Sequence, residues 1–176
     1  MRMINKLKPI DFEILAELIK NPRLSDRQVA KKLHTSQPTI TRRRRELEKE
    51  RLLDYTANPD FKKLGYEILA VTFGKWNPQM IGDQKMEAAK TFLSKHPGMI
   101  FVSTGQGLGF DRVTISLHKN YSEYGLFMRE LREEWEPFLG QPRSFLISLK
   151  SDNIPRDLTF KYLSELIGRE HVEQKT

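Results

Sequence analysis

The sequence contains no cysteine among its 176 residues. This absence excludes a disulfide framework, a zinc site with cysteine ligands, an iron–sulfur cluster and a cysteine nucleophile. No apolar run approaches the roughly 20 residues that a transmembrane helix needs. Residues 1–9 lack the apolar segment of a signal peptide. We therefore expect a cytoplasmic protein with no membrane partner and with room for one large or two small domains.

Acidic residues are scarce in one part of the chain. Residues 20–51 contain only four of them, against 11 lysines and arginines. The resulting surplus of +7 equals the formal net charge of the whole chain. A basic patch confined to one segment is typical of a surface that binds a polyanion. A solvated helix face is the simpler alternative, and the surrounding sequence decides between the two.

Hydrophobic spacing and capping residues predict three helices in the first 50 residues. Asn21-Pro22 ends the first, because the residue before a proline is disfavoured in a helix. Ser25 opens the second as part of a capping box with Gln28, and Ser36 caps the third. Two helices joined by a short turn, after a first helix, form a helix-turn-helix arrangement. The predicted ranges are 11–20, 25–34 and 36–49.

The rest of the chain predicts a wing and a second domain. Residues 52–57 form a predicted strand of a short hairpin, the wing. From Gly65 onward the order is β-α-β-β-α-β, the split unit of ferredoxin-like domains. The predicted strands are 66–73, 99–104, 112–118 and 144–149, and the predicted helices are 84–95 and 121–138. The fold class is therefore α+β, with a winged helix-turn-helix in residues 1–60, a ferredoxin-like domain in 61–151 and a helical extension in 152–176.

Two features of the second half bear on assembly. In residues 66–73, Ile68, Ala70 and Thr72 alternate with Leu69, Val71 and Phe73, so both faces of the predicted sheet are apolar. One face contacts the helices, and the other needs a partner or stays exposed. We therefore expect a homodimer or a higher homo-oligomer. The predicted terminal helix, 155–168, is amphipathic and is expected to cover the sheet or to join the dimer interface.

The third helix of a helix-turn-helix lies in the major groove. At about 100° per residue, Ile40 and Leu47 define its buried side. Arg44 lies near that side, so we expect its stem along the core and its charged end at the edge. Candidates for base edges are Gln37, Thr39 and Arg42, with Thr41 flanking them. Candidates for phosphate contacts are Arg27, Lys31, Arg43 and Arg45. Ser36 is a further candidate for a phosphate contact, in addition to its role as a helix cap.

The first 70 residues resemble the leucine-responsive regulator/AsnC (Lrp/AsnC) family. The resemblance rests on D-x-x-I-L-x-x-L from residue 11, N-x-R-x-S from 21, S-Q-P-T from 36, R-x-L-E from 45, and N-P followed by L-G-Y. A weaker likeness continues to about residue 150. It implies a prokaryotic, nucleoid-associated transcriptional regulator that binds double-stranded DNA. The chain departs from the family at Arg44, where the residue is usually apolar.

In that family, small ligands such as amino acids bind near a short G-x-x-D turn of the sensing domain. Here the turn is stretched to residues 105–111, and residues 105–109 form a predicted loop with three glycines. A hairpin connection and a small-molecule effector site are both open interpretations of it. The candidate ligand residues are Thr104, Gly105, Gly107 and Asp111.

Two other functional classes remain. An enzyme resembling siroheme decarboxylase would share the two-domain layout, but the four histidines are isolated in sequence and no nucleophile–base set is recognisable. A non-DNA-binding effector or assembly module leaves the basic segment unexplained. We therefore predict a sequence-specific DNA-binding transcriptional regulator with no catalytic residues, no metal and no cofactor.

Overall fold

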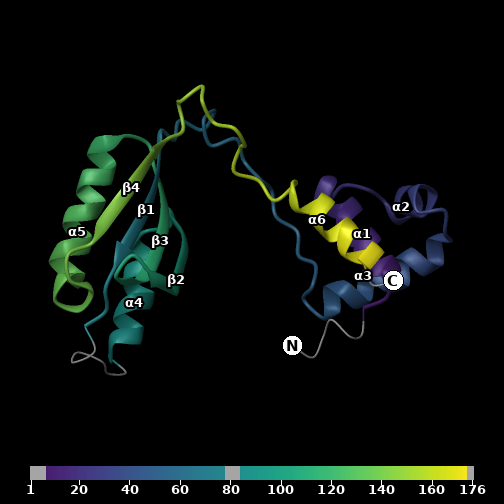
Figure 1. Cartoon of the computed structure of the whole chain (residues 1–176), viewed down its shortest axis with the longest axis horizontal. Helices are drawn as coiled ribbons and strands as arrows, with labels where there is room; N and C mark the ends of the chain where they lie inside the picture. Colours follow the sequence, from purple (N-terminus) through teal and green to yellow (C-terminus); the bar gives the residue numbers. More distant parts are fainter. Residues whose placement is uncertain (1–6, 78–83, 174–176) are drawn as a thin grey trace. The chain divides into compact units, whose positions relative to one another are not determined.

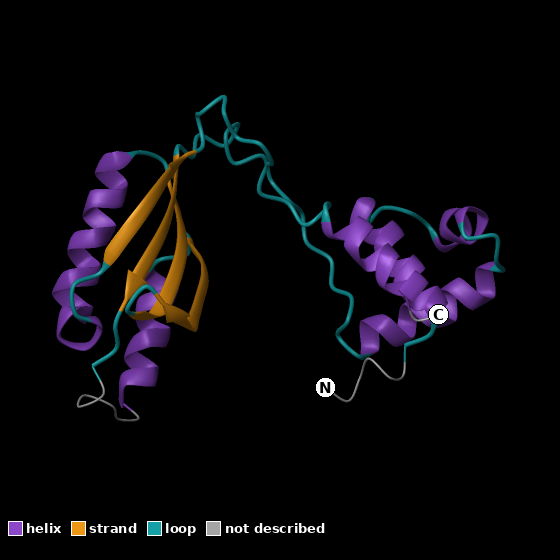
Figure 2. Cartoon of the chain, viewed as in Figure 1, coloured by secondary structure: helices purple, strands orange, loops and turns teal. Residues whose placement is uncertain are grey.

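The structure, a computed structural model, describes residues 7–77 and 84–173, without the side chains of 84–86, 136–138 and 170–173. The chain divides into two compact units (Figure 1). The first contains the described residues up to Asn58 and those from Arg156 onward, and the second lies between Pro59 and Pro155. Both ends of the chain therefore build the first unit. Figure 2 shows helices in the first unit and the strands in the second.

The three helices predicted for the first unit are confirmed. They are α1 (Pro9–Lys20), α2 (Asp26–Lys32) and α3 (Gln37–Lys49). The side chain of Ser25 accepts a hydrogen bond from the backbone N–H of Gln28, and Ser36 caps α3 in the same way. In the turn between α2 and α3, His34 adopts a φ of 50°. This left-handed residue turns the chain, so only four residues separate α2 from α3.

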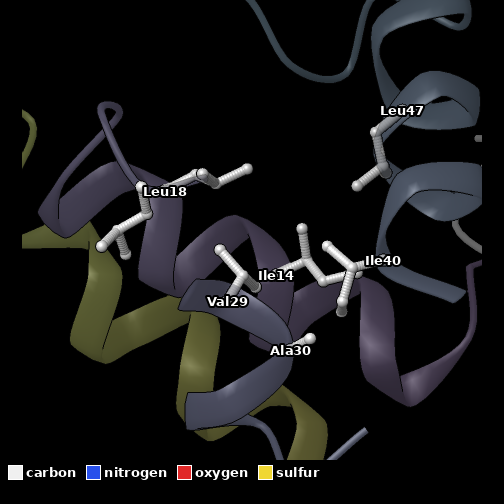
Figure 3. Packing of buried hydrophobic residues seen from close by; sticks show 7 residues of the cluster. Ile14, Leu18, Val29, Ala30, Ile40 and Leu47 are labelled. Carbon is white, nitrogen blue, oxygen red and sulfur yellow. The ribbon is translucent and has the colours of Figure 1, made fainter. Parts of the chain in front are cut away.

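The core of the first unit lies where these helices meet (Figure 3). Ile40 and Leu47 of α3 are 0% and 2% exposed, as the helical spacing predicts. They pack in one hydrophobic cluster with residues of α1 and α2, and this fixes which face of α3 remains outside. The other buried members of the cluster are Ile14, Leu18, Leu24, Val29 and Ala30.

The predicted wing is wrong in its secondary structure. Residues 52–57 form no strand, and residues 61–65 are a series of turns. A strand needs a paired neighbour to satisfy its backbone N–H and C=O groups, and residues 60–65 contain no apolar run to form the second strand of a short hairpin. The segment after α3 is therefore an exposed loop, in which Tyr55 is 40% exposed.

The second unit has the predicted ferredoxin-like topology. Its elements are β1 (Ile68–Gly74), α4 (Gln84–Lys95), β2 (Met99–Gly107), β3 (Phe110–His118), α5 (Tyr121–Leu139) and β4 (Arg143–Ser148). The strands form one sheet in the order β2-β3-β1-β4, and every neighbouring pair is antiparallel.

Side chains of β1 alternate between the two faces of this sheet as predicted. Ala70 is fully buried in a cluster with aromatic and aliphatic residues of α4 and α5. Leu69 packs on the opposite face with Leu117 and Leu149. The register places Val71 opposite Ile115 and Phe145 on that same face. The sheet therefore has one face covered by helices and one open face, of which Phe61 and Tyr66 cover the end around Leu69.

The glycine-rich segment is a hairpin rather than the expected loop over 105–109. Strand β2 continues to Gly107, which pairs with Phe110 across a two-residue turn. The turn residues Leu108 and Gly109 have φ values of 53° and 79°. Positive φ at both central positions matches the twist of the flanking strands, and glycine adopts it without steric cost. The segment is therefore a hairpin connection, and this geometry does not test the effector interpretation.

The terminal helix also differs from the prediction. Helix α6 spans Leu163–Glu173 instead of 155–168, and it packs on α1 rather than on the sheet (Figure 1). A Cβ atom built on Gly168 would lie 3.9 Å from the Cβ of Ala16. A small residue on each helix allows the two backbones to approach closely. The C-terminal segment is thus an added layer of the first unit.

Candidate nucleic-acid interface

The outer side of α3 carries a continuous stripe of polar and charged side chains, which we call the α3 stripe. It lines an open hollow of about 660 Å³. Its members recur at the spacing of helical neighbours, so they face one way along the helix. They are Gln37, Pro38, Thr41, Arg42, Arg45, Glu46 and Lys49.

Four predicted DNA-binding residues belong to this stripe: Gln37, Thr41, Arg42 and Arg45. Glu46 and Lys49 were not among the predicted residues, although a spacing of about 100° per residue puts both on the side opposite Ile40. The complete stripe has three positive charges and one negative charge.

Ser36 and Thr39 lie together at the N-terminus of α3. The Ser36 Oγ accepts the Thr39 backbone N–H at 3.4 Å, and the two hydroxyl oxygens are 2.8 Å apart. The Thr39 hydroxyl is therefore engaged within the cap, and its methyl group remains for an apolar contact. On α2, Arg27 and Lys31 are both exposed and one helical turn apart, with their charged groups available to solvent.

Arg43 does not fit its predicted role as a phosphate contact. Its side chain is 7% exposed and donates two hydrogen bonds to the carboxylate of Asp11, which is fully buried. A third hydrogen bond goes to Glu46. A buried charge is tolerated when it is paired, and this pair joins α1 to α3 across 32 residues. No local signal in the sequence indicates such a partner.

Arg44 lies at the edge of the core, as predicted. One guanidinium nitrogen donates to the Leu24 carbonyl and to the Asp26 carboxylate, both at 3.0 Å. The Nε donates to the Tyr55 hydroxyl at 2.7 Å, and the guanidinium carbon is 5.1 Å from the centre of the Tyr55 ring. Arg44 therefore connects α3 to α2 and to the loop after α3, and it is not free to contact DNA.

Asp26 fixes the other side of the same junction. The Thr41 hydroxyl donates to its carboxylate at 2.7 Å. Burial alone would raise the pKa of Asp26, but the hydrogen bonds from Thr41 and Arg44 lower that pKa below its usual value. The ionised carboxylate is thus the favoured form. It holds α2 against α3, and it sets the orientation of Thr41 within the α3 stripe.

The predicted ligand residues lie in the β2–β3 hairpin. Thr104, Gly105 and Gly107 are exposed on β2. A carboxylate oxygen of Asp111 accepts the backbone N–H of Trp76 at 2.8 Å, so this side chain fastens the end of β1 to β3. That structural role accounts for Asp111 without a ligand. Binding of an effector by these four residues stays a prediction.

Comparison with known proteins defines the class of the first unit. Residues 7–53 match the family model described as winged helix-turn-helix DNA-binding. The chain therefore contains a DNA-binding domain of this class, and the matched segment includes α1, α2 and the whole α3 stripe.

Relatives and solved structures extend the likeness. An uncharacterised HTH-type transcriptional regulator of Pyrococcus furiosus is 28% identical over 127 residues, which is 72% of this chain and 82% of the relative. The HTH-type transcriptional regulator LrpC of Bacillus subtilis is 40% identical over 67 residues, or 38% of this chain and 46% of LrpC.

The structure of B. subtilis LrpC matches with a TM-score of 0.69 at 24% identity, covering 85% of this chain and 99% of LrpC. An AsnC family transcriptional regulator from Agrobacterium tumefaciens matches with a TM-score of 0.71 at 16% identity, covering 89% and 99%. The resemblance to Lrp/AsnC regulators is thus confirmed, and the chain has their fold.

Among the described residues, no helix combines the length and the apolar character that a membrane span requires.

Proposed function

We propose that this protein is a sequence-specific, DNA-binding transcriptional regulator of prokaryotic type, located in the cytoplasm with the nucleoid, and not an enzyme. The observation that carries the proposal is the α3 stripe, in which Arg42, Arg45 and Lys49 project from one side of a capped helix. Such a helix fits the major groove, and its positive charges favour the phosphates beside it.

The contacts follow from the chemistry of the exposed groups. Gln37 pairs with adenine and Arg42 with guanine at the base edges, and the Thr39 methyl packs on thymine. Arg45 and Lys49 on α3, with Arg27 and Lys31 on α2, contact phosphates and set the register of the protein on the duplex. Asp26 and Arg44 act behind this surface, because they hold α2 and α3 at a fixed angle.

A homodimer through the second unit completes the proposal. The open face of the sheet exposes Phe101 by 50%, Phe145 by 67% and Ile147 by 37%. Apolar side chains of this size, grouped on one face, favour a contact with a second copy. A two-fold dimer presents two copies of α3, so we expect a pseudo-palindromic operator. Modulation by a small molecule near Thr104 belongs to the same proposal.

Selection of binding sites from random duplex DNA by the purified full chain tests this function. We expect a pseudo-palindromic sequence to be enriched. Its affinity should fall steeply between 50 and 200 mM salt, with a log–log slope on the order of −5 to −7 for six to eight phosphate contacts per dimer. A slope near zero, or a purified protein with a Soret absorption band and no affinity for DNA, would contradict the proposal.

Two alanine variants separate the base contacts from the phosphate contacts. Arg42→Ala should cost roughly 1–3 kcal/mol on the selected site and relax the preference at one position of each half-site. Arg45→Ala should weaken binding to all sequences alike and reduce the salt slope. Identical sequence preferences for both variants would show that Arg42 does not contact a base.

A further inference from the structure

Glu46 is the acidic member of the α3 stripe, on a surface that otherwise attracts DNA. Its side chain is 45% exposed, and its carboxylate bridges two arginines. One oxygen accepts from the exposed Arg42 at 3.1 Å, and the other accepts from the buried Arg43. A carboxylate in this position repels phosphates, so its presence on a DNA-binding surface requires a physical explanation.

Arg43 holds the carboxylate of Glu46 on its inner side and so restricts the rotation of this side chain. Arg43 is itself fixed by two hydrogen bonds to Asp11, which is 0% exposed. The chain of contacts therefore runs from the buried start of α1, through Arg43, to Glu46 at the surface. By contrast, both sides of the Arg42–Glu46 pair are exposed, with side-chain exposures of 59% and 45%. Such a pair is weak, and it can exchange for contacts with DNA.

We propose that Glu46 is a specificity-determining residue. Its carboxylate accepts a hydrogen bond from the N4 amino group of cytosine when Arg42 leaves Glu46 to contact guanine. The inference rests on the proposed function. To reach the O6 and N7 atoms of a guanine, Arg42 releases one carboxylate oxygen of Glu46. That oxygen then needs a donor, and the cytosine amino group in the major groove supplies one for a Glu side chain.

Where guanine or thymine occupies that position, the same carboxylate opposes binding. The edges of guanine and thymine present acceptor oxygens in the major groove, and these cannot donate to a carboxylate. The oxygen released by Arg42 then lies without a donor beside acceptors and phosphates, because Arg43 keeps Glu46 in the stripe. Discrimination thus comes from a repulsive contact at wrong sites as well as an attractive one at the right site.

The test compares Glu46→Gln with Glu48→Gln in the full chain. Both variants remove one negative charge from α3 and keep an acceptor oxygen. Glu48 is a matched control, because it contacts Arg44 and Tyr55 and lies outside the α3 stripe. We expect Glu46→Gln to bind random DNA more tightly and to reduce the ratio of operator to random affinity roughly tenfold. Glu48→Gln should strengthen both affinities equally and leave the ratio unchanged.

A ratio that changes equally in the two variants would overturn the role of Glu46. Circular dichroism checks that each variant is folded. A second measurement uses the wild-type protein alone: its selected operator should contain one C·G pair per half-site whose replacement by T·A lowers affinity roughly tenfold. An operator without such a pair also overturns the inference. If the wild-type chain selects no sequence at all, the proposed function itself fails, and the two failures are thereby distinguished.

Discussion

Asp11 and Arg43 form a buried ion pair that ties the first turn of α1 to the middle of α3. Asp11 also accepts the backbone N–H of Lys8 at 2.6 Å, so the same carboxylate helps to begin α1. With Arg43 on the inside, Arg42 and Arg45 lie on the outside. The pair therefore fixes the rotation of α3 about its axis, and so determines which side chains the α3 stripe contains.

Removal of Arg43 should destabilise the first unit. Arg43→Ala leaves the carboxylate of Asp11 buried without its charged partner, which typically costs about 3–5 kcal/mol. The measurement is chemical unfolding followed by far-ultraviolet circular dichroism. Both tryptophans, Trp76 and Trp135, lie in the second unit, so their fluorescence reports separately on that unit.

Arg42→Ala is the control for this prediction. Arg42 is exposed and its pair with Glu46 lies at the surface, so its loss should change the free energy of unfolding by about 0–1 kcal/mol. Equal losses of stability in the two variants would show that the Asp11–Arg43 pair has no special structural role.

We expect His118 to make the second unit sensitive to mild acid. It is 4% exposed, its Nε2 lies 2.8 Å from the Ser116 hydroxyl, and its ring contacts Tyr124 and Phe127. Burial lowers the pKa of His118, and His96 lowers it further, while the negative charge of Glu123 raises it. The neutral ring is thus the form that the folded protein favours.

Because the folded pKa of His118 is lower than the unfolded one, this group stabilises the fold fully above about pH 6.5. The contribution falls as the pH decreases below that value and is lost once the folded pKa is passed. We expect the stability of the second unit, followed by tryptophan fluorescence, to decline from pH 7 to pH 5.5. His118→Gln should flatten this decline. An unchanged pH dependence in the variant would assign the effect to other groups.

At the scale of elements, α6 is the least expected feature. The chain leaves the first unit at Asn58, builds a complete ferredoxin-like domain, and returns to cover α1. Ser164 of α6 is 4% exposed and Ala16 of α1 is 6% exposed. The contact is made by small residues, so a longer side chain at Gly168 would push the helices apart.

Removal of residues 156–176 should destabilise the first unit selectively. The face of α1 that contacts α6 would become solvent-exposed, with a loss of at least about 1 kcal/mol, or roughly 4–8 °C in Tm for a unit of this size. Circular dichroism should report this loss, whereas the tryptophan fluorescence transition of the second unit stays unchanged. Gly168→Leu should show a smaller effect in the same direction. A truncated chain as stable as the full one would mean that the packing of α6 does not stabilise the first unit.

At the scale of the whole molecule, we expect assembly to depend on the open face of the sheet. Phe145→Asp places a charge on that face, where a second copy would otherwise bury the ring. We therefore expect the dissociation constant of the dimer to rise roughly tenfold or more. Light scattering on the full chain at tens of micromolar measures this directly.

Phe160→Asp serves as the control for assembly. Phe160 is 75% exposed and belongs to the first unit, whereas the sheet belongs to the second. Its replacement should leave the mass of the assembly unchanged. If Phe160→Asp dissociates the dimer and Phe145→Asp does not, the interface lies in the first unit instead.

Much of the fold was predictable because its signals are local. The caps at Ser25 and Ser36 act on backbone groups within three residues, and the alternation of Leu69 and Ala70 follows from the pleat of one strand. The stripe residues Gln37, Arg42 and Arg45 were likewise found from helical spacing alone. The absence of a wing strand was missed, since a strand depends on a partner that one segment cannot reveal.

The sequence by itself determined the order of helices and strands, the basic segment and the outward side of α3, because each depends on neighbours within one or two turns. Only the tertiary structure decided which of the arginines are buried, which are held at the edge of the core and which are exposed. Arg43 is buried because Asp11 meets it across 32 residues, and Arg44 is held because Tyr55 folds back onto it. The place of α6 was decided in the same way, since an amphipathic helix requires an apolar partner but does not specify which one.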